Sequence, residues 1–319
     1  METPRPVYQY QPETQYSFTT PQEFYRLRDF GQKFEATIAF VRKHGLNMYR
    51  VLLIPALLAV VPMLAVSLFQ ILNRPTQVDP GDWRAVLASS GPGLGAVIIL
   101  SLTVYMVLYA MFYSFVKLRM YQPDPTAKLT PQEVWAHARG YVLPLMGYAF
   151  VAVVLVLLAM MFLFLPGIYV GVVFSMLLPI VVFEDAGLGR SISRSFSLMS
   201  GKWWSTFGLI VVGSMALGII TVPLSLFSQG AAVAVVAGGG FASKVALAVA
   251  QLVQLVVQLL LAPLFNLLLL FQYFNLVERR DHVSLQWRAE QLGQTPAAAQ
   301  AAAAPDDNLF RPSYGDQSL

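Results

Sequence analysis

The sequence predicts an all-α polytopic membrane protein with about six transmembrane helices, and three observations support this prediction. Hydrophobic residues make up 56% of the 319 residues and charged residues only 12%, whereas soluble domains carry roughly 25% charged residues. Several apolar runs approach or exceed the roughly 20 residues that a helix needs to cross a bilayer. Lys and Arg are concentrated in alternate connecting segments. This composition suits a surface that faces lipid.

The apolar runs are arranged as three hairpins. Prolines inside the runs are compatible with spanning helices, because neighbouring groups can satisfy the freed carbonyls. Only Pro166-Gly167 separates the third run from the fourth, which predicts a tight hairpin. The Gly- and Ala-rich residues 230–240 are too weakly apolar to be assigned to a span. The six predicted spans cover residues 51–72, 94–116, 141–165, 168–183, 205–227 and 244–274.

The distribution of basic residues predicts the topology. If both termini lie on one side of the membrane, that side receives 18 of the Lys and Arg residues and the other side receives 3. Cytoplasmic segments carry an excess of Lys and Arg. We therefore expect both termini, and the connector of residues 184–204, to be cytoplasmic.

Each hairpin is expected to follow a short amphipathic helix at the cytoplasmic membrane surface. The sequence TPQE, a capping-box pattern with Pro at the first helical position, occurs at Thr20 and again at Thr130. The connector 184–204 is the third such segment. In the first segment, the predicted apolar face consists of Leu27, Phe30, Phe34, Ile38 and Val41.

The connector (EDAGLGRSISRSFSLMSGKWW) has the spacing of a helix with two different faces. The apolar face consists of Leu188, Ile192, Phe196, Met199 and Trp203. The opposite face consists of Arg190, Ser193, Arg194, Ser197 and Gly201. Such a helix lies in the membrane interface with its apolar face toward the acyl chains. Glu184 and Asp185 stand at its start, where negative charge is favourable and Asp can act as a cap.

This connector supplies the candidate binding residues. One hypothesis is that Arg190 and Arg194 bind an anionic lipid headgroup or a cytoplasmic partner. The alternative is an ordinary interfacial helix whose arginines only determine topology. Glu184 is interpreted as a structural cap or a partner of an arginine, with an intramembrane functional carboxylate as the alternative. The candidate set comprises Glu184, Arg190, Arg194, Lys202, Trp203 and Trp204.

The last span supplies a second candidate set. Gln251, Gln254 and Gln258 follow at spacings of three and four, with Asn266 beyond them. They could line a path for a substrate or lipid. The alternative is hydrogen bonding between helices of the bundle, which is common for such residues in spans.

The sequence predicts no enzyme, no cofactor and no metal site. It contains no cysteine and none of the catalytic motifs for acyl transfer, nucleotide binding or zinc proteolysis. Its three histidines lie in predicted juxtamembrane segments without clustered carboxylates. Nucleic-acid binding is not expected, because the positive charge is spread along the membrane rim.

Part of the connector resembles a bacterial protein family. The residues that carry the resemblance are Pro179, Glu184, Gly187, Arg194, Ser195, Leu198, Gly201 and Trp204. They are similar to a pattern found in six-span inner-membrane proteins, among them the membrane domain of glycerophosphoryl diester phosphodiesterases. In those proteins a separate soluble barrel hydrolyses the substrate, and no polar stretch here approaches the roughly 250 residues of a barrel. The resemblance therefore implies a fold and a role in the bacterial inner membrane, without hydrolysis.

Three segments and one function are expected. Residues 1–19 form a disordered cytoplasmic tail, residues 20–285 the six-span domain, and residues 286–319 an Ala-rich disordered tail. The expected function is that of a non-enzymatic inner-membrane protein that organises lipids or partner proteins through its interfacial helices. The alternative is a transporter or lipid-handling channel that uses the polar face of the last span. Expected partners are membrane lipids, in particular anionic ones, and a partner protein or a second copy of the chain.

Overall fold

The computed structural model describes residues 16, 18, 20–72, 93–122, 124, 127–237 and 240–293, and these residues contain helices and no strand. The predicted all-α class is confirmed. Five of the described helical segments are long and apolar enough to cross a membrane. The first predicted span lies in the second part of α2, so the count of six stays a prediction. The helices are α1 (Pro21–Phe24), α2 (Phe30–Leu72), α4 (Gly93–Met120), α5 (Pro131–Phe162), α6 (Phe164–Phe174), α7 (Leu177–Phe183), α8 (Leu188–Met199), α9 (Trp203–Val236), α10 (Phe241–Asp281) and α11 (Val283–Gly293).

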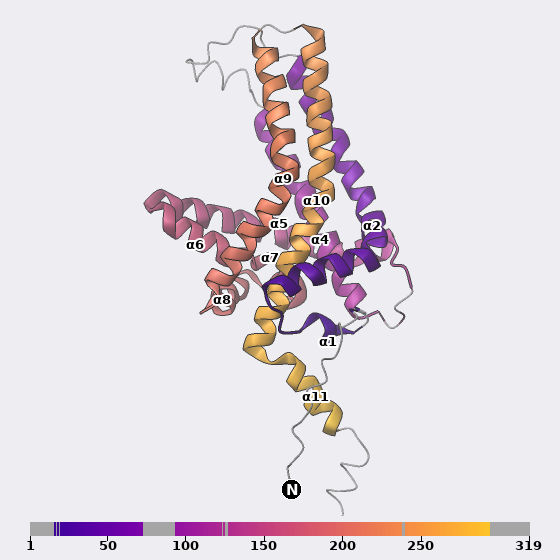
Figure 1. Cartoon of the computed structure of the whole chain (residues 1–319), viewed down its shortest axis with the longest axis vertical. Helices are drawn as coiled ribbons and strands as arrows, with labels where there is room; N and C mark the ends of the chain where they lie inside the picture. The colour runs from indigo at the N-terminus through magenta and orange to yellow at the C-terminus, as the bar shows by residue number, and fades with distance from the viewer. Residues whose placement is uncertain are drawn as a thin grey trace, which may run out of the picture.

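Helices α9 and α10 form a hairpin along the longest axis of the molecule (Figure 1), where α10 packs against α2, and α2 packs in turn against α4. Helices α1, α8 and α11 gather at one end, which we call the terminal end, and α9 meets α10 at the opposite end. The two described ends of the chain therefore lie at the same end of the molecule. The prediction that this end is cytoplasmic rests on that charge distribution.

The second half of α10 forms the centre of the fold. From Pro263 to Glu278 nearly every side chain is buried, whereas many side chains of the first half are exposed. A helix of 41 residues is about 60 Å long, twice the roughly 30 Å of a bilayer core. Only part of α10 can therefore cross the hydrocarbon, and the remainder packs within the protein.

A glycine allows α9 and α10 to approach closely. A Cβ atom on Gly213 would lie 2.9 Å from Leu268 Cδ2 and 3.2 Å from Phe265 Cε2 on α10. Small residues let membrane helices pack closely, which increases their van der Waals contact. The fifth predicted span also proves longer than expected, since α9 continues to Val236 through the Gly- and Ala-rich segment.

The third and fourth predicted spans form the expected tight hairpin of α5 and α6, but the turn lies at Leu163 instead of Pro166-Gly167. Leu163 is extended, with φ −160° and ψ 136°. Pro166 instead stands in the first turn of α6, where its missing N–H costs nothing. A Cβ atom on Gly167 would lie 2.1 Å from Met160 Cγ, so this glycine is required for the close approach of α6 to α5.

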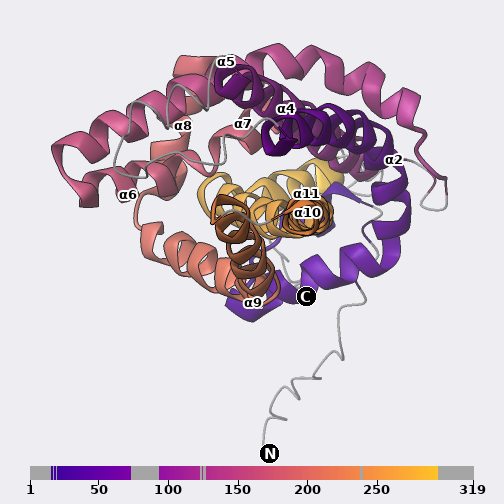
Figure 2. The same ribbon diagram turned by 90° about the horizontal axis from the view of Figure 1, so that it is seen from above.

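The α5–α6 hairpin projects sideways from the bundle, across the direction of α9 and α10 (Figures 1 and 2). Its tip is apolar and exposed on all sides, and consists of Met161, Phe162, Leu163, Phe164 and Leu165. An element that is apolar all round is stable only when surrounded by other apolar groups. The tip of this hairpin is therefore suited to contact with lipid acyl chains.

The two predicted capping boxes differ in the structure. The capping box at Thr130 is confirmed, because Glu133 N donates to Thr130 Oγ1 (3.3 Å) and Thr130 N donates to Glu133 Oε2 (2.9 Å). The capping box at Thr20 is wrong, since its side chain makes no cap hydrogen bond. There the Glu23 carboxylate accepts from Phe18 N, and the helix stops after four residues. Helices α2 and α5 then continue without interruption from the amphipathic segment into the apolar one.

The first part of α2 runs across the long axis near the terminal end (Figure 1). Three residues of its predicted apolar face are exposed, namely Leu27, just before the helix, Phe30 and Ile38. Phe34 and Val41 are half buried, and Val41 packs against the core. A second set, including Ala36 and Phe40, packs in the core. The exposed apolar face suits contact with lipid.

Both predicted tails lie largely outside the described residues. Phe18, within residues 1–19, is fully buried against Phe24, Phe40 and Phe271. At the other end, α11 continues to Gly293, past the predicted domain boundary at residue 285.

Replacing Gly213 by Leu should destabilise the fold by about 1–3 kcal/mol, because the added side chain must displace Leu268 and Phe265. The matched control is Gly208→Leu on the same helix, where a Cβ atom has no neighbour within 4 Å. Thermal unfolding in detergent measures both. Equal midpoints for the two variants would show that α9 and α10 do not depend on this contact.

Candidate functional site

Helix α8 lies at the terminal end and has three faces, where the sequence predicted two. Ser191 and Ser195 are fully buried, and their hydroxyls donate to Ala186 O (3.1 Å) and Ser191 O (2.8 Å). Their small side chains allow close packing, which accounts for the serines in this connector. Phe196, on the predicted apolar face, is half exposed and contacts the rings of Tyr169 and Phe174 on α6. The arginine face points elsewhere.

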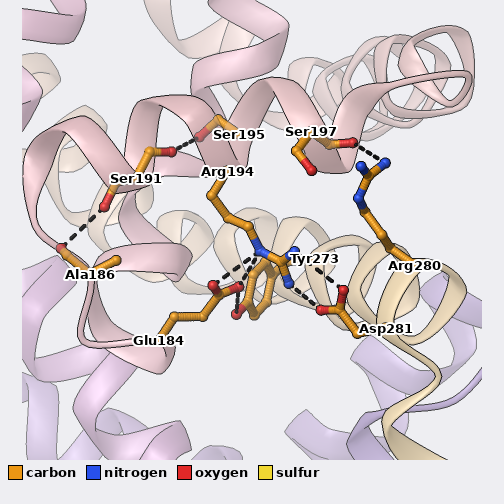
Figure 3. Close-up of polar contacts among 9 residues, drawn as sticks. All are labelled: Glu184, Ala186, Ser191, Arg194, Ser195, Ser197, Tyr273, Arg280 and Asp281. Atoms are coloured by element: carbon orange, nitrogen blue, oxygen red, sulfur yellow. Dashed lines mark hydrogen bonds and ion pairs between the residues drawn. The ribbon is translucent and has the colours of Figure 1, made fainter.

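Arg194 joins two carboxylates from distant parts of the chain (Figure 3). Its Nε donates to Glu184 Oε1 (3.0 Å) and Oε2 (3.1 Å), and its Nη1 donates to Asp281 Oδ1 (3.3 Å). Nη2 donates to the other oxygen of Asp281. Tyr273 OH completes the group by donating to Glu184 Oε1 (3.1 Å). We call these four residues, Glu184, Arg194, Tyr273 and Asp281, the Arg194 network.

The Arg194 network is partly shielded from water, because the side chains of Arg194, Glu184 and Asp281 are 20%, 17% and 31% exposed. Burial alone would lower the pKa of Arg194, but the hydrogen bonds to Asp281 and Glu184 outweigh burial and raise it. The guanidinium therefore remains charged and acts as a fixed cross-link. The interpretation of Glu184 as an arginine partner agrees with this geometry.

A second contact fixes α8 to α10. Arg280 Nη1 donates to Ser197 O (3.0 Å) in the last turn of α8 (Figure 3). A basic side chain there satisfies one of the carbonyls that a helix C-terminus leaves unpaired. Together with the Arg194–Asp281 pair, this contact holds α8 at two points along its length.

Asp185 does not cap α8, so that prediction is wrong. The N-cap residue is Gly187, which makes no side-chain cap bond. The Asp185 carboxylate instead accepts from Lys117 Nζ (2.9 Å) and from Tyr141 OH. Burial raises the pKa of Asp185, but these hydrogen bonds from Tyr141 and Lys117 outweigh it and lower the pKa. The two adjacent acidic residues therefore bond to different helices. Glu184 bonds to α8 and α10, and Asp185 bonds to α4 and α5.

A polar cavity of about 680 Å³ opens beside the Arg194 network. Aromatic and apolar side chains from several elements complete its wall, and Arg190 lies at it with an exposed side chain. The two arginines and two carboxylates around it balance in charge. Its lining consists of Tyr25, Tyr121, Glu184, Arg190, Arg194, Tyr273, Val277, Asp281, Val283 and Trp287.

The other predicted residues of the connector are divided between surface and interior. Lys202 and Trp204 are exposed, and Trp204 shows 77% of its surface. Trp203 packs inside, stacked on Tyr169, whose carbonyl accepts from Trp203 Nε1 at 3.2 Å. The chain turns between α8 and α9 at Gly201, whose φ of +71° is a conformation that glycine adopts without strain.

The polar residues of the last span do not share one environment. Gln251 and Gln254 are half buried and Gln258 is exposed. Asn266 is buried, donates to Ala262 O (2.8 Å) and accepts from Tyr113 OH (3.3 Å) on α4. For Asn266, the interpretation as a hydrogen-bonding residue between helices therefore agrees with the structure.

Sequence reasoning missed Asp281, Tyr273 and the aromatic residues of the cavity. Asp281 lies 87 positions from Arg194, so no local spacing relates them. One signal in the sequence could have indicated this site. Polar side chains recur in the last turns of α10, and only Asn266, further from the end, was among the predicted residues. No group of three or more His, Cys, Asp or Glu residues suited to a metal ion occurs in the described part of the chain.

The chain was compared with protein-family models, curated proteins and solved structures, and none matches.

Replacing Arg194 by Gln should destabilise the protein by about 2–3 kcal/mol, because two partly buried carboxylates lose their shared cation. Arg190→Gln is the matched control and should stay within about 0.5 kcal/mol of the parent, since its side chain is exposed. The double variant Glu184→Gln/Arg194→Gln should recover part of the lost stability. Thermal unfolding in detergent measures all three, and equal effects of the two arginine changes would contradict the cross-link.

Proposed function

We propose that this protein is a non-enzymatic membrane protein that organises anionic lipids at the cytoplasmic surface through helix α8. One observation carries the proposal: Arg194 is bound by two carboxylates, while Arg190 on the same helix is exposed at a polar cavity. Arg194 therefore serves to hold the helix. Arg190 can offer its charge to an external anion.

The surroundings of Arg190 support a lipid as that anion. Lys202 and Trp204 are exposed at the far end of the connector, and the half-exposed Phe196 lies between them and Arg190 in the sequence. Basic residues near a membrane surface attract anionic lipids, and tryptophan favours the headgroup level. A helix held at two points displays these groups in a constant arrangement.

We also propose that the chain belongs to the bacterial six-span family that its connector resembles. Glu184 and Arg194, two of the residues that carry the resemblance, form the central ion pair. Gly201, a third, occupies the positive-φ turn. These roles give a physical reason for the residue pattern that the connector shares with that family. If the chain belongs to the family, an inner-membrane location follows.

Arg190→Gln should reduce the enrichment of anionic lipid around α8 by about fivefold, since one basic residue near a membrane surface contributes about 1 kcal/mol. The experiment uses a variant in which Trp204 is the single tryptophan, reconstituted in vesicles. Quenching of its fluorescence by brominated phosphatidylglycerol is compared with quenching by brominated phosphatidylcholine.

The matched control is Arg139→Gln, which removes an exposed arginine from α5. The control should leave the preference of Trp204 for the anionic quencher unchanged. Equal quenching by the two lipids in the parent protein would exclude the proposed function. Selective binding of a cytoplasmic protein without lipid preference would favour the partner alternative.

A lipid-handling channel is the second candidate, because Asn266 lines an apolar cavity of about 210 Å³ between α2, α4 and α10. The test is a triple variant, Gln251→Leu, Gln254→Leu and Gln258→Leu, with Val249→Leu/Val253→Leu as the control. A channel would lose movement of a fluorescent phospholipid across vesicle bilayers in the triple variant alone, at equal expression. If the protein only organises lipids, then the parent, the triple variant and the control should all show no such movement.

A further inference from the structure

A third cavity, of about 300 Å³, is lined by four basic side chains together with His44, Asn47 and two apolar residues. Its volume is at the lower end of the range for small-molecule sites. No acidic residue lines it in the described part of the chain, although Asp124 in the nearby connector attracts Arg119. The lining consists of Lys43, His44, Leu46, Asn47, Arg50, Arg119, Ala127 and Lys128.

His44 is the most informative residue of this basic cavity. Its side chain is only 7% exposed, and its Nε2 has no hydrogen-bond partner among the described residues. A buried polar atom without a partner is costly. Burial, together with the charges of Arg119 and Lys43, lowers the pKa of His44 to about 4. The imidazole is therefore neutral at neutral pH, and the site carries a positive field that an anion would neutralise.

The basic cavity and the apolar cavity follow one another along α2. Leu46, Arg50, Leu53 and Leu57 follow at spacings of four, three and four, so they lie along one face of the helix. Leu46 and Arg50 line the basic cavity, and Leu53 and Leu57 line the apolar one. Leu46, Leu53 and Leu57 are each more than half exposed. The basic cavity therefore suits the charged headgroup of a phospholipid, and the apolar cavity suits its acyl chains.

Helix α4 repeats this order on the opposite wall. Arg119, in its last turn, lines the basic cavity, while Tyr105, Tyr109 and Phe112 line the apolar one. Basic pockets between membrane helices on the cytoplasmic side are suited to anionic headgroups. Both helices thus present cations toward the terminal end and apolar side chains beyond it.

We infer that the space between α2 and α4 binds one anionic phospholipid. The phosphate lies in the basic cavity, where Arg50 and Lys128 provide charge and His44 Nε2 gains a partner. One acyl chain follows the Leu46–Leu57 face into the apolar cavity. This site is formed by other helices than α8, so it goes beyond the proposed function and can fail independently of it.

The test measures binding to the purified full-length protein by native mass spectrometry and by the rise in thermal midpoint. The probes are dioleoyl phosphatidylglycerol, dioleoyl phosphatidylcholine, dihexanoyl phosphatidylglycerol and inorganic phosphate. Arg50→Gln/Lys128→Gln should weaken dioleoyl phosphatidylglycerol binding by about tenfold to thirtyfold. Both side chains are exposed, so the variant should fold. The matched control is Arg42→Gln/Arg139→Gln, which removes the same charge from exposed positions outside the cavity.

Ala56→Phe tests the acyl-chain part of the site, because Ala56 lines the apolar cavity. This variant should weaken binding of the dioleoyl lipid by about tenfold, since each buried CH₂ contributes about 0.8 kcal/mol, and should affect the dihexanoyl lipid less. The inference is overturned if the two charge variants bind equally, or if phosphatidylcholine binds as well as phosphatidylglycerol. It is also overturned if inorganic phosphate alone reproduces the whole charge-dependent stabilisation, which would indicate a soluble anion. An unchanged Ala56→Phe affinity would exclude the apolar cavity as the acyl site.

Discussion

The fold depends on the burial of the second half of α10, which the other helices surround. Its polar side chains each bond to a different neighbour. Gln272 Nε2 donates to Thr206 Oγ1 on α9 (2.8 Å), and Asn275 Nδ2 donates to Arg28 O before α2 (3.0 Å). Glu278 accepts from Ser284 N on α11 (3.0 Å). Because a buried polar group is costly unless it is paired, each of these bonds restricts where its neighbouring helix can lie.

The Arg194 network extends the same constraint to the terminal end of the molecule. Tyr273 and Asp281 belong to α10, and through Glu184 and Arg194 they connect the end of α7 and helix α8 to it. The helix with the most distinctive sequence is thereby held in one position. Its exposed residues are therefore displayed in a constant arrangement.

Much of this architecture was predictable because membrane insertion imposes local rules. Apolar length and the Thr130 capping box each depend on residues close together in the chain, and each predicted a feature that the structure has. The predictions that proved wrong have a common cause, which is contact with residues outside the local motif. At Thr20 an identical motif lost its capping role because Glu23 bonds to Phe18, a residue outside the motif. The turn of the second hairpin lies at Leu163, where the close contact of Gly167 with Met160 decides the geometry.

By itself the sequence determined the all-α class, the apolar helices and the helical connector, because these follow from hydrophobicity and helical period. Only the tertiary structure decided which arginine is bonded and which is exposed. Arg190 and Arg194 lie one turn apart and are indistinguishable by spacing. The difference arises from Asp281, which the packing of α10 brings to one arginine from 87 positions away. The basic and apolar cavities depend likewise on α2 and α4 lying side by side.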